Sequence, residues 1–296
     1  MRLIRSIDEV RHFSRQLRAH NASLGLVPTM GALHEGHLSL VRKAKNDGGA
    51  VVVSIFVNPT QFGPREDLSR YPRNLDRDLD LLAPMDVDAV FVPEAAAIYP
   101  PGFDTFVEPG AVAQPLEGAS RPGHFRGVST VVLKLFNIVE PTFAYFGQKD
   151  FQQAIVVRRL IEDFNLAVRL VLCPIVREPD GLALSSRNAY LKPIERAVAL
   201  TLNRSLRRAG EVFCSGEASA QAIAGEMRAV LQAEPRVQVD YSVVVAPNTF
   251  APPSRVTPGC VALVAARVGS TRLLDNLILA SPNTSDEERL LLALAV

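Results

Sequence analysis

The stretch VPTMGALHEGH, residues 27–37, constrains the fold more than any other part of this chain. An apolar run at residues 24–27 leads into it, and two histidines, His34 and His37, stand three residues apart at its end. This order predicts a buried strand, a glycine-bearing turn and a helix that begins near Gly36. The first N–H groups of a helix lack intrahelical partners and carry the positive end of its dipole, so we expect the turn to hold an anion, with phosphate the natural occupant. Both histidines then act as donors to that anion; the alternative is that one caps the helix and the other faces solvent.

The first half of the chain alternates between apolar strand-like runs and helical patterns. Residues 50–57 form a continuous β-branched and apolar run, which is typical of a strand buried on both faces of a parallel sheet. Strands are also expected at residues 24–27, 88–92, 143–146 and 168–172, and helices at 36–46, 73–82, 127–139 and 151–164, with a first helix opened by a capping box at residues 6–9. Strands that alternate with helices predict an α/β fold, a doubly wound, Rossmann-like parallel sheet with ligands at the carboxyl ends of its strands.

The pattern changes at about Val176. Two long helices are expected at residues 193–209 and 218–233, followed by three strands at 237–245, 260–266 and 271–279. Helices grouped apart from strands predict a smaller α+β domain. We therefore divide the chain into a Rossmann-like ligand-binding domain, residues 1–176, and an α+β C-terminal domain, residues 177–296, that closes over the site. The tail after Pro282 is expected to contain a short apolar helix.

Charge and cysteine content limit the classes of partner. The chain has 32 Lys and Arg against 31 Asp and Glu, a formal net charge of +1, so no excess of positive charge marks it for nucleic acid or an anionic membrane. Its three cysteines have neither zinc spacing nor the even number of a disulfide framework. No signal-peptide pattern or membrane-length apolar run is present in the sequence. We expect a cytoplasmic protein without nucleic-acid or membrane partners.

Two further polar clusters stand where strands or loops are expected to end. In the first, Gly147 lets a ligand approach the backbone, Lys149 supplies a positive charge for phosphate, and Asp150 accepts from ribose hydroxyls or caps a helix. The second, residues 184–188, is a loop of small donors and one arginine that can surround phosphates as negative charge grows on them. The alternatives are a solvated helix start for the first cluster and an ordinary polar turn for the second.

Other residues suit an organic substrate or a metal. Gln61 and Gln153 carry amides that both donate and accept, which fits a ligand with hydroxyl and carboxylate groups, although each can instead cap backbone groups. The turn at residues 121–124 and the loop at 61–70 are expected to be mobile walls that close over substrate. Asp78 is our candidate for holding Mg²⁺ through water, although carboxylates at a helix start usually act only as partners of the helix dipole.

Six ordered motifs carry a family resemblance: VPTMGALHEGH, SIFVNPTQF, YPRN, RPGHFRGV, FGQKDFQQ and VREPDGLALSSRNAYL. They span roughly residues 24–191, with a weaker match continuing to the DNLIL run, and they resemble the pantothenate synthetases (pantoate–β-alanine ligases) within the H-x-G-H nucleotidyltransferase superfamily. The resemblance implies an AMP-forming ligase. Pantoate's carboxylate attacks the α-phosphate of ATP, giving pantoyl adenylate and pyrophosphate, and the amine of β-alanine then displaces AMP. It also implies a homodimer and a requirement for Mg²⁺.

The resemblance assigns roles to residues of this chain. His37 is the proton donor to the phosphates with His34 beside it, and Lys149 and Arg187 complete the catalytic set. Gln61 and Gln153 hold pantoate, and Gln61 also lies near the β-alanine site. The ATP-binding residues are Met30, Gly31, Ala32, Leu33, His34, Glu35, Gly36, His37, Gly147, Gln148, Lys149, Asp150, Val176, Leu184, Ser185, Ser186 and Arg187.

Three departures from the family pattern stand out. Gln148 replaces a frequent Glu and Leu184 a frequent Met, both beside contacts that the resemblance gives to the backbone or to neighbouring residues. Arg77 replaces a carboxylate of some relatives, which weakens the case for a two-Asp magnesium site.

Two other functions remain open from the sequence. One is a nucleotidylyltransferase that joins a nucleotide to a phosphorylated alcohol and stops at the first transfer. The other is a non-catalytic nucleotide-binding module on the same fold. The ligase hypothesis requires that His37, Lys149 and Arg187 converge on one nucleotide.

Overall fold

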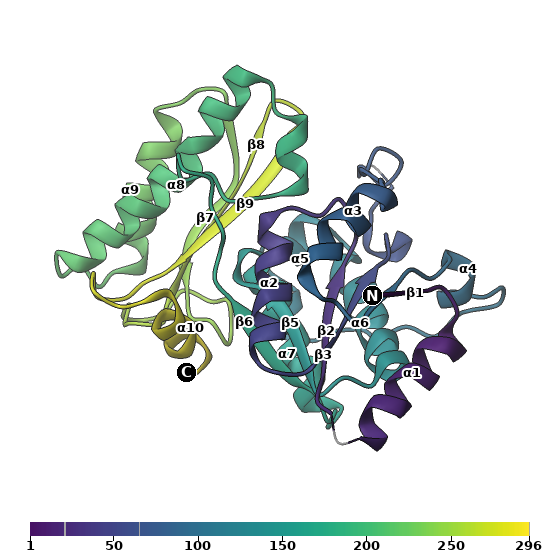
Figure 1. Cartoon of the computed structure of the whole chain (residues 1–296). Helices are drawn as coiled ribbons and strands as arrows, with labels where there is room; N and C mark the ends of the chain where they lie inside the picture. Colours follow the sequence, from purple (N-terminus) through teal and green to yellow (C-terminus); the bar gives the residue numbers. More distant parts are fainter. Residues whose placement is uncertain (21, 65, 296) are drawn as a thin grey trace. The chain divides into compact units, whose positions relative to one another are not determined.

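The computed structural model describes residues 1–20, 22–64 and 66–295 (Figure 1). The chain divides into two compact units. The first unit comprises Met1–Gly147 and Gln152–Cys173, and the second comprises Gln148–Phe151 and Pro174–Val296. The division of roles between residues 1–176 and 177–296 stays a prediction.

The first unit is built on a six-stranded sheet whose strands all run parallel, in the order β1-β4-β3-β2-β5-β6. The strands are β1 (Arg2–Ile4), β2 (Leu24–Thr29), β3 (Ala50–Ile55), β4 (Ala89–Phe91), β5 (Phe143–Gly147) and β6 (Arg169–Cys173). Val51, Val52 and Val53 are all fully buried, so β3 is covered on both faces as its apolar run predicts. The predicted doubly wound α/β sheet is confirmed.

Helices cover both faces of this sheet (Figure 1). They are α1 (Ile7–Ala19), α2 (Glu35–Asn46), α3 (Leu75–Leu82), α4 (Ala95–Ile98), α5 (Glu117–Ser120), α6 (His124–Val139) and α7 (Phe151–Asp163), with short 3₁₀ turns η1 (Pro59–Gln61), η2 (Ala83–Met85), η3 (Ala111–Ala113) and η4 (Gln148–Asp150). Parallel crossovers are right-handed, so the strand order places α1, α6 and α7 on one face and α2 and α3 on the other. In agreement, α1 contacts α6, and α2 packs on β2, β3 and β5.

The N-terminal region differs from the expectation in two ways. Ser6 is the N-cap of α1, but its side chain makes no capping hydrogen bond, so the predicted capping box is wrong. Burial of Val10 and Phe13 holds this helix instead. Strand β1 was not predicted, because it is three residues long, lies at the edge of the sheet and exposes Arg2 and Leu3.

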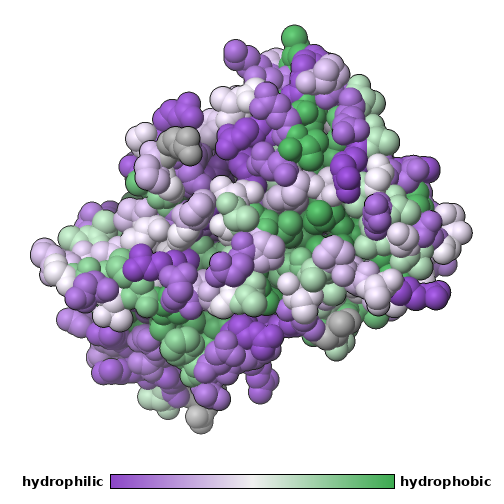
Figure 2. Space-filling model, turned by 180° about the vertical axis from the view of Figure 1, so that it is seen from behind, coloured by the Kyte–Doolittle hydropathy of each residue, from purple (hydrophilic) through white to green (hydrophobic). Residues whose placement is uncertain are grey.

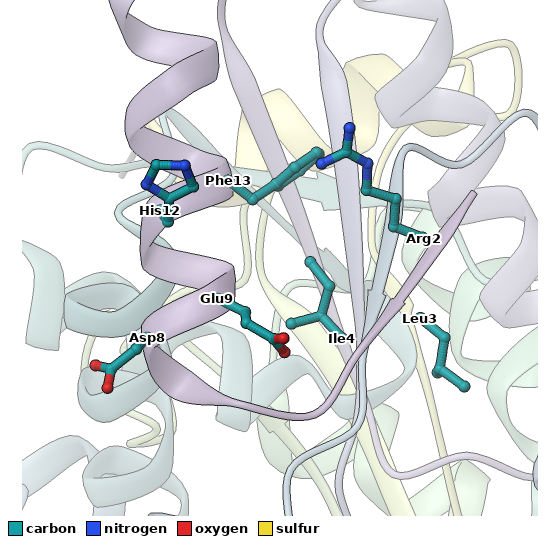
Figure 3. A pocket seen from close by; sticks show the side chains of 7 residues that line it. All are labelled: Arg2, Leu3, Ile4, Asp8, Glu9, His12 and Phe13. Carbon is teal, nitrogen blue, oxygen red and sulfur yellow. The ribbon is translucent and has the colours of Figure 1, made fainter.

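A hollow of about 700 Å³ lies between β1 and α1 (Figure 3). Its lining includes Arg2, whose guanidinium lies 5.6 Å from the centroid of the Phe13 ring. Two strands, β4 and β3, separate β1 from β2, so this hollow is remote from the turn that follows β2.

The second unit has the predicted α+β composition. Two long helices, α8 (Pro193–Cys214) and α9 (Ala220–Gln232), accompany an antiparallel sheet in the order β7-β8-β9, formed by β7 (Val237–Val245), β8 (Val261–Val268) and β9 (Thr271–Ile278). Leu202, Ile223 and Val264 belong to a single apolar core that the helices share with the sheet. A 3₁₀ segment, η5 (Ser186–Tyr190), precedes α8.

The C-terminal tail forms the predicted short helix, α10 (Asp286–Leu294). Arg289 fastens it to the second unit by donating to the backbone oxygens of Ile278 (2.8 Å) and Ser281 (3.2 Å). Leu290 and Ala293 are buried. The tail therefore docks on its own chain.

The surface mixes polar and apolar side chains on the face that Figure 2 shows. Within the described ranges, every helix is too short or too polar to span a bilayer.

Candidate active site

The strand order creates a switch point between β2 and β5. From β2 the chain proceeds to β3 and β4 on one side, whereas β5 leads to β6 on the other. Ligands of doubly wound sheets bind beyond the carboxyl ends of the strands at such a point. Strand β2 ends at Thr29, so the stretch that contains both histidines leaves the sheet at the switch point.

Asp78 holds the turn after β2. Its Oδ2 accepts the N–H of Ala32 (2.9 Å) and its Oδ1 accepts the N–H of Leu33 (2.8 Å), and the side chain is buried. Gly31 has φ +78°, and a Cβ there would lie 2.9 Å from Asp78 Oδ2, so only glycine fits. Ala32 also has a positive φ of 51°. The hydrogen bond from the Ala32 N–H to Asp78 supports this conformation, which an alanine side chain does not favour.

His34 and His37 cap helix α2 reciprocally. His34 Nδ1 accepts the N–H of Gly36 (3.2 Å), and His37 Nδ1 accepts the N–H of His34 (3.3 Å). The two rings lie 4.1 Å apart between centroids, tilted by 38°. Because each Nδ1 is an acceptor, the proton of each neutral ring is on Nε2. The cap therefore turns both imidazoles into Nε2–H donors.

The same cap corrects one expectation about the helix N-terminus. The N–H of Gly36 is bonded to His34 Nδ1, and the N–H of His37 is bonded to the His34 backbone oxygen (2.8 Å). These two N–H groups are therefore not directed at a ligand, so the prediction that they are is wrong. The physical reason is that His34 serves as the N-cap residue and satisfies them itself.

Asn58 orients Gln61 in the 3₁₀ turn after β3. Asn58 Nδ2 donates to Gln61 Oε1 (3.1 Å) and to the Gly127 oxygen (3.1 Å), while its Oδ1 accepts from the Tyr99 hydroxyl (2.8 Å). With its oxygen occupied, Gln61 directs Nε2 toward Met30 Sδ at 3.1 Å. A thioether is a weak acceptor. Gln61 therefore presents a donor beside the histidine turn, which a ligand oxygen would bond better than sulfur does.

The two segments predicted to be mobile walls are bonded to each other. Arg121 donates to both carboxylate oxygens of Glu66 (2.7 and 2.9 Å), and His124 Nδ1 donates to the Gln61 backbone oxygen (2.9 Å). His124 Nε2 accepts from Arg121 (3.0 Å). Arg65, within the predicted wall at residues 61–70, lies outside the described residues. The mobility of these walls stays a prediction.

Burial and charge set the protonation of this network. Burial, followed by the Arg121 charge, lowers the pKa of His124 to about 4. Burial alone would raise the pKa of Glu66, but the hydrogen bond and charge of Arg121 outweigh it and hold that pKa below its ordinary value. At neutral pH the network is thus an ion pair beside an uncharged imidazole.

We expect the stability of the first unit to fall as the pH falls from about 6.5 to about 4. In that window the unfolded chain protonates His124, whose ordinary pKa is 6.5, while the folded chain, with a pKa of about 4, does not. The loss attributable to this group is about 3 kcal/mol in total. Urea unfolding between pH 4 and pH 7.5 measures it. His124→Asn, which keeps a donor for the Gln61 oxygen, should remove this part of the slope. The exposed His12→Asn should leave it unchanged.

Two adjacent glutamines of α7 differ in their surroundings. Gln152 is buried, accepts the N–H of Glu117 (3.1 Å) and donates to the oxygens of Val112 (3.0 Å) and Pro115 (2.8 Å). Its amide is therefore structural. Gln153, the predicted pantoate ligand, is half-buried one position further along the helix. The role of Gln153 stays a prediction.

In the second unit, strand β9 holds the turn that contains Lys149. Asn276 is buried and donates through Nδ2 to the backbone oxygens of Gln148 (2.9 Å) and Lys149 (3.0 Å). Gln148 Nε2 returns a hydrogen bond to Asn276 Oδ1 (3.0 Å). Lys149 Nζ lies 3.7 Å from Asp150 Oδ1, an ion pair that leaves the lysine partly exposed.

The predicted phosphate loop leaves a short hairpin of the same unit. The N–H of Leu184 bonds to the Val176 oxygen (3.0 Å), and Arg177 pairs across the hairpin with Ala183. Ser185 caps η5 by accepting the N–H of Arg187 (3.3 Å). Ser185, Ser186 and Arg187 are all half-buried. The convergence of His37, Lys149 and Arg187 on one nucleotide stays a prediction.

The side chains of the described residues do not form a complete metal-binding site. Both oxygens of Asp78 accept backbone N–H groups, a geometry that favours a role in holding the turn over one as a Mg²⁺ ligand. Among the described residues, no group of three or more His, Cys, Asp or Glu side chains is placed to bind a metal.

Comparison with known proteins identifies the family. Residues 2–278 match the sequence profile described as Pantoate-beta-alanine ligase. This chain belongs to that family. The pantothenate synthetases of Roseiflexus castenholzii and Thermotoga neapolitana are 56% and 54% identical to it over 279 residues, covering 94% of this chain and 99% and 100% of theirs. The crystal structure of the Thermus thermophilus pantothenate synthetase superposes with a TM-score of 0.89 at 46% identity, covering 94% of this chain and 99% of that one.

A second solved relative is described with ligands. It is the pantoate-beta-alanine ligase of Francisella tularensis, complexed with beta-gamma ATP and beta-alanine, with a TM-score of 0.78, 35% identity and coverage of 94% of this chain and 97% of that one. The family profile ends at residue 278, so α10 lies beyond it.

The structure adds residues that the sequence analysis of this pantoate–β-alanine ligase family member missed. Asn58 precedes Pro59 and Thr60, and an Asn-Pro start to a turn signals an Asx-type contact. Asp275 and Asn276 are two adjacent polar residues inside an otherwise apolar strand, and both are buried. Buried polar residues need partners, and that signal was available in the sequence.

Proposed function

We propose that this protein joins pantoate to β-alanine at the expense of ATP, in pantothenate biosynthesis. In the first step a carboxylate oxygen of pantoate bonds to the α-phosphorus of ATP and the bond to pyrophosphate breaks. In the second step the β-alanine nitrogen bonds to the acyl carbon, the bond to AMP breaks, and the amine loses a proton. Family membership over nearly the whole chain supports this proposal.

One observation of the structure carries the proposal furthest. The reciprocal cap of His34 and His37 fixes two Nε2–H donors at the switch point, beside a Gln61 amide whose donor is already oriented. A triphosphate needs donors that strengthen as negative charge collects on it, and a hydroxy acid needs an amide. A subsite for a triphosphate next to a subsite for a hydroxy acid fits a reaction in which a carboxylate attacks a nucleotide.

We assign the nucleotide to the residues that the family resemblance gives. Residues 30–37 line it, with His37 as donor to the phosphates and His34 beside it. Lys149 and Arg187 neutralise the charge that develops on the α-phosphate and the departing pyrophosphate. The remaining nucleotide contacts are Gly147, Gln148, Asp150, Val176, Leu184, Ser185 and Ser186.

Pantoate is assigned to Gln61 and Gln153. The donor of Gln61 suits the carboxylate or a hydroxyl of the acid, and its position beside Met30 places the acid next to the nucleotide turn. Holding the two reactants together in this orientation supplies much of the rate. The second step needs a water-excluding site, because water would hydrolyse the adenylate.

Magnesium and a homodimer belong to the proposal on family resemblance, and a cytoplasmic location belongs to it on the cysteine content and the sequence patterns described above. Mg²⁺ is expected to arrive bound to the phosphates of ATP, the usual mode for this cation. Sedimentation measures the oligomeric state, and a chelator titration against ATP measures the metal requirement.

The test is a set of omission assays that separates the ligase from a nucleotidylyltransferase. We expect exchange of labelled pyrophosphate into ATP only when pantoate is present, and sustained AMP release only after β-alanine is added. Exchange without pantoate, or AMP release without β-alanine at the full rate, contradicts the proposal. Absence of any turnover, with ATP still bound, would favour the non-catalytic module.

A further inference from the structure

Strand β9 holds two separate stretches of the second unit through adjacent residues. Asn276 donates to the backbone oxygens of Gln148 and Lys149 (2.9 and 3.0 Å) and accepts from the Gln148 side chain (3.0 Å). These bonds use both Nδ2 hydrogens and the oxygen of an amide that is buried. A stretch that follows β5 in sequence is thereby fixed to β9, 128 residues away along the chain.

The hydrogen bonds of Asn276 also set the direction in which the neighbouring backbone N–H groups point. In a trans peptide the C=O and the N–H of the next residue point in opposite directions. When Asn276 holds the oxygens of Gln148 and Lys149, the N–H groups of Lys149 and Asp150 are turned away from β9. The same bonds fix the Cα of Lys149, from which its ammonium group extends.

The neighbouring residue holds the second stretch. Asp275 is buried and accepts from two nitrogens of Arg177 (2.7 and 2.9 Å), and Arg177 also donates to the Gly181 oxygen (3.1 Å). Arg177 begins the hairpin that ends at Ala183, directly before Leu184. Asp275 therefore anchors the hairpin from which the predicted phosphate loop emerges.

We propose that Asn276 and Asp275 are positioning residues that attach the Lys149 turn and the phosphate-loop hairpin to a single strand, β9. The backbone of both ATP-binding stretches is thereby held in a fixed position relative to that strand. The inference builds on the proposed function, because it takes from it that these stretches bind ATP. Neither residue touches the reacting atoms. Their substitution should weaken ATP binding through the backbone they hold.

The experiment compares Asn276→Ala and Asn276→Asp with a matched control on the same sheet. Asn276→Ala removes both donors, and Asn276→Asp keeps the size but places an acceptor against two carbonyl oxygens. The control is Asp240→Asn, which removes the charge that pairs Asp240 with Arg272 of β9 (2.6 Å), away from either stretch. Pantoate-dependent pyrophosphate exchange gives the KM for ATP and the maximal rate of each variant, and thermal unfolding gives its stability.

We expect Asn276→Ala to raise the KM for ATP about tenfold or more, the loss that two hydrogen bonds represent, while the KM for pantoate changes less than threefold or so. Asn276→Asp should be worse than alanine at pH 8 and should recover as the pH is lowered to 6, relative to the unaltered protein. Protonation of the new carboxyl restores one donor. Asp240→Asn should match the unaltered protein in both constants.

The results separate the two proposals. If the unaltered protein shows no pantoate-dependent exchange, the proposed function fails. If it does, and Asn276→Ala lowers the unfolding temperature without altering the KM for ATP, Asn276 is merely structural and the inference is overturned. Should Asn276→Ala not fold, the pH-dependent recovery of Asn276→Asp decides: its absence overturns the inference.

Discussion

Asp78→Asn is expected to destabilise the first unit by about 3 kcal/mol and to loosen the turn that precedes His34 and His37. The carboxylate accepts two backbone N–H groups, one on each oxygen, at 2.9 and 2.8 Å. An amide keeps one acceptor and turns N–H hydrogens toward the other N–H group. Hydrogen bonds to a charged acceptor contribute about 1.5–3 kcal/mol each, and a buried donor left without a partner adds its desolvation cost.

The measurement combines urea unfolding with amide hydrogen exchange. We expect the amides of Ala32 and Leu33 to exchange faster in Asp78→Asn, and kcat to fall because His34 and His37 follow directly. Asp76→Asn is the control, since Asp76 is exposed on the first turn of the same helix and shares any interaction with its dipole. The control should stay within about 0.5 kcal/mol of the unaltered protein.

The same variant tests the assignment of Asp78 to magnesium. A residue that holds the turn alters stability and exchange in the absence of any metal. A metal ligand would instead raise the Mg²⁺ concentration needed for half-maximal rate while leaving the metal-free stability unchanged. The second pattern would contradict the role that the hydrogen bonds of Asp78 indicate.

The parallel core of the fold was predictable because its signal is local. Strands β2, β3 and β5 are apolar runs bounded by turn residues, and the helices between them have one apolar face, so each element can be recognised without its neighbours. Strand β1 could not be recognised in this way. Its three residues are held by pairing with β4, about 87 residues further along the chain, and not by their own composition.

The candidate site shows the same difference between features with a local sequence pattern and features held by distant residues. The glycine-bearing turn and the two histidines were recognised from a pattern of eleven residues. Gln61 was recognised from its position just after the apolar run that forms β3. The residues that hold the turn after β2 and the Lys149 turn are far away in sequence. Asp78 lies 46 residues from Ala32, and Asn276 lies 128 residues from Gln148, so only the folded chain brings these acceptors and donors together. The direction of the histidine rings was also beyond the sequence, because the reciprocal cap that fixes each Nε2–H forms only with the helix.

His37→Gln is expected to lower kcat of the first step about 10²-fold to 10³-fold while preserving the fold of the helix. Glutamine at the third helical position can reach back to the N-cap N–H, the bond that His37 Nδ1 makes at 3.3 Å, so the cap survives. The imidazole Nε2–H does not: the glutamine amide keeps N–H groups, but it cannot give up a proton, and its flexible chain does not hold them where the ring held its donor. Loss of a preorganised donor to developing negative charge typically costs this much, about 2.7–4 kcal/mol of transition-state stabilisation.

His37→Ala is the companion variant, because it removes the donor and the cap together. Both variants should lose pantoate-dependent pyrophosphate exchange to a similar extent, but only His37→Ala should also lower the unfolding temperature. If His37→Gln retained more than about a tenth of the exchange rate, the contribution of His37 would lie in the cap and not in the chemistry.

The two steps of the reaction can be measured separately, which tests in which step His37 acts. His37 is assigned to the phosphates as pyrophosphate leaves, so a reaction started from preformed pantoyl adenylate and β-alanine bypasses the step that needs its donor. We expect His37→Gln to consume the adenylate at a rate within about threefold of the unaltered protein, since no pyrophosphate charge develops in that step. An equal loss in both steps would instead mean that His37 shapes the pocket as a whole, because a donor specific to one transition state cannot slow the other.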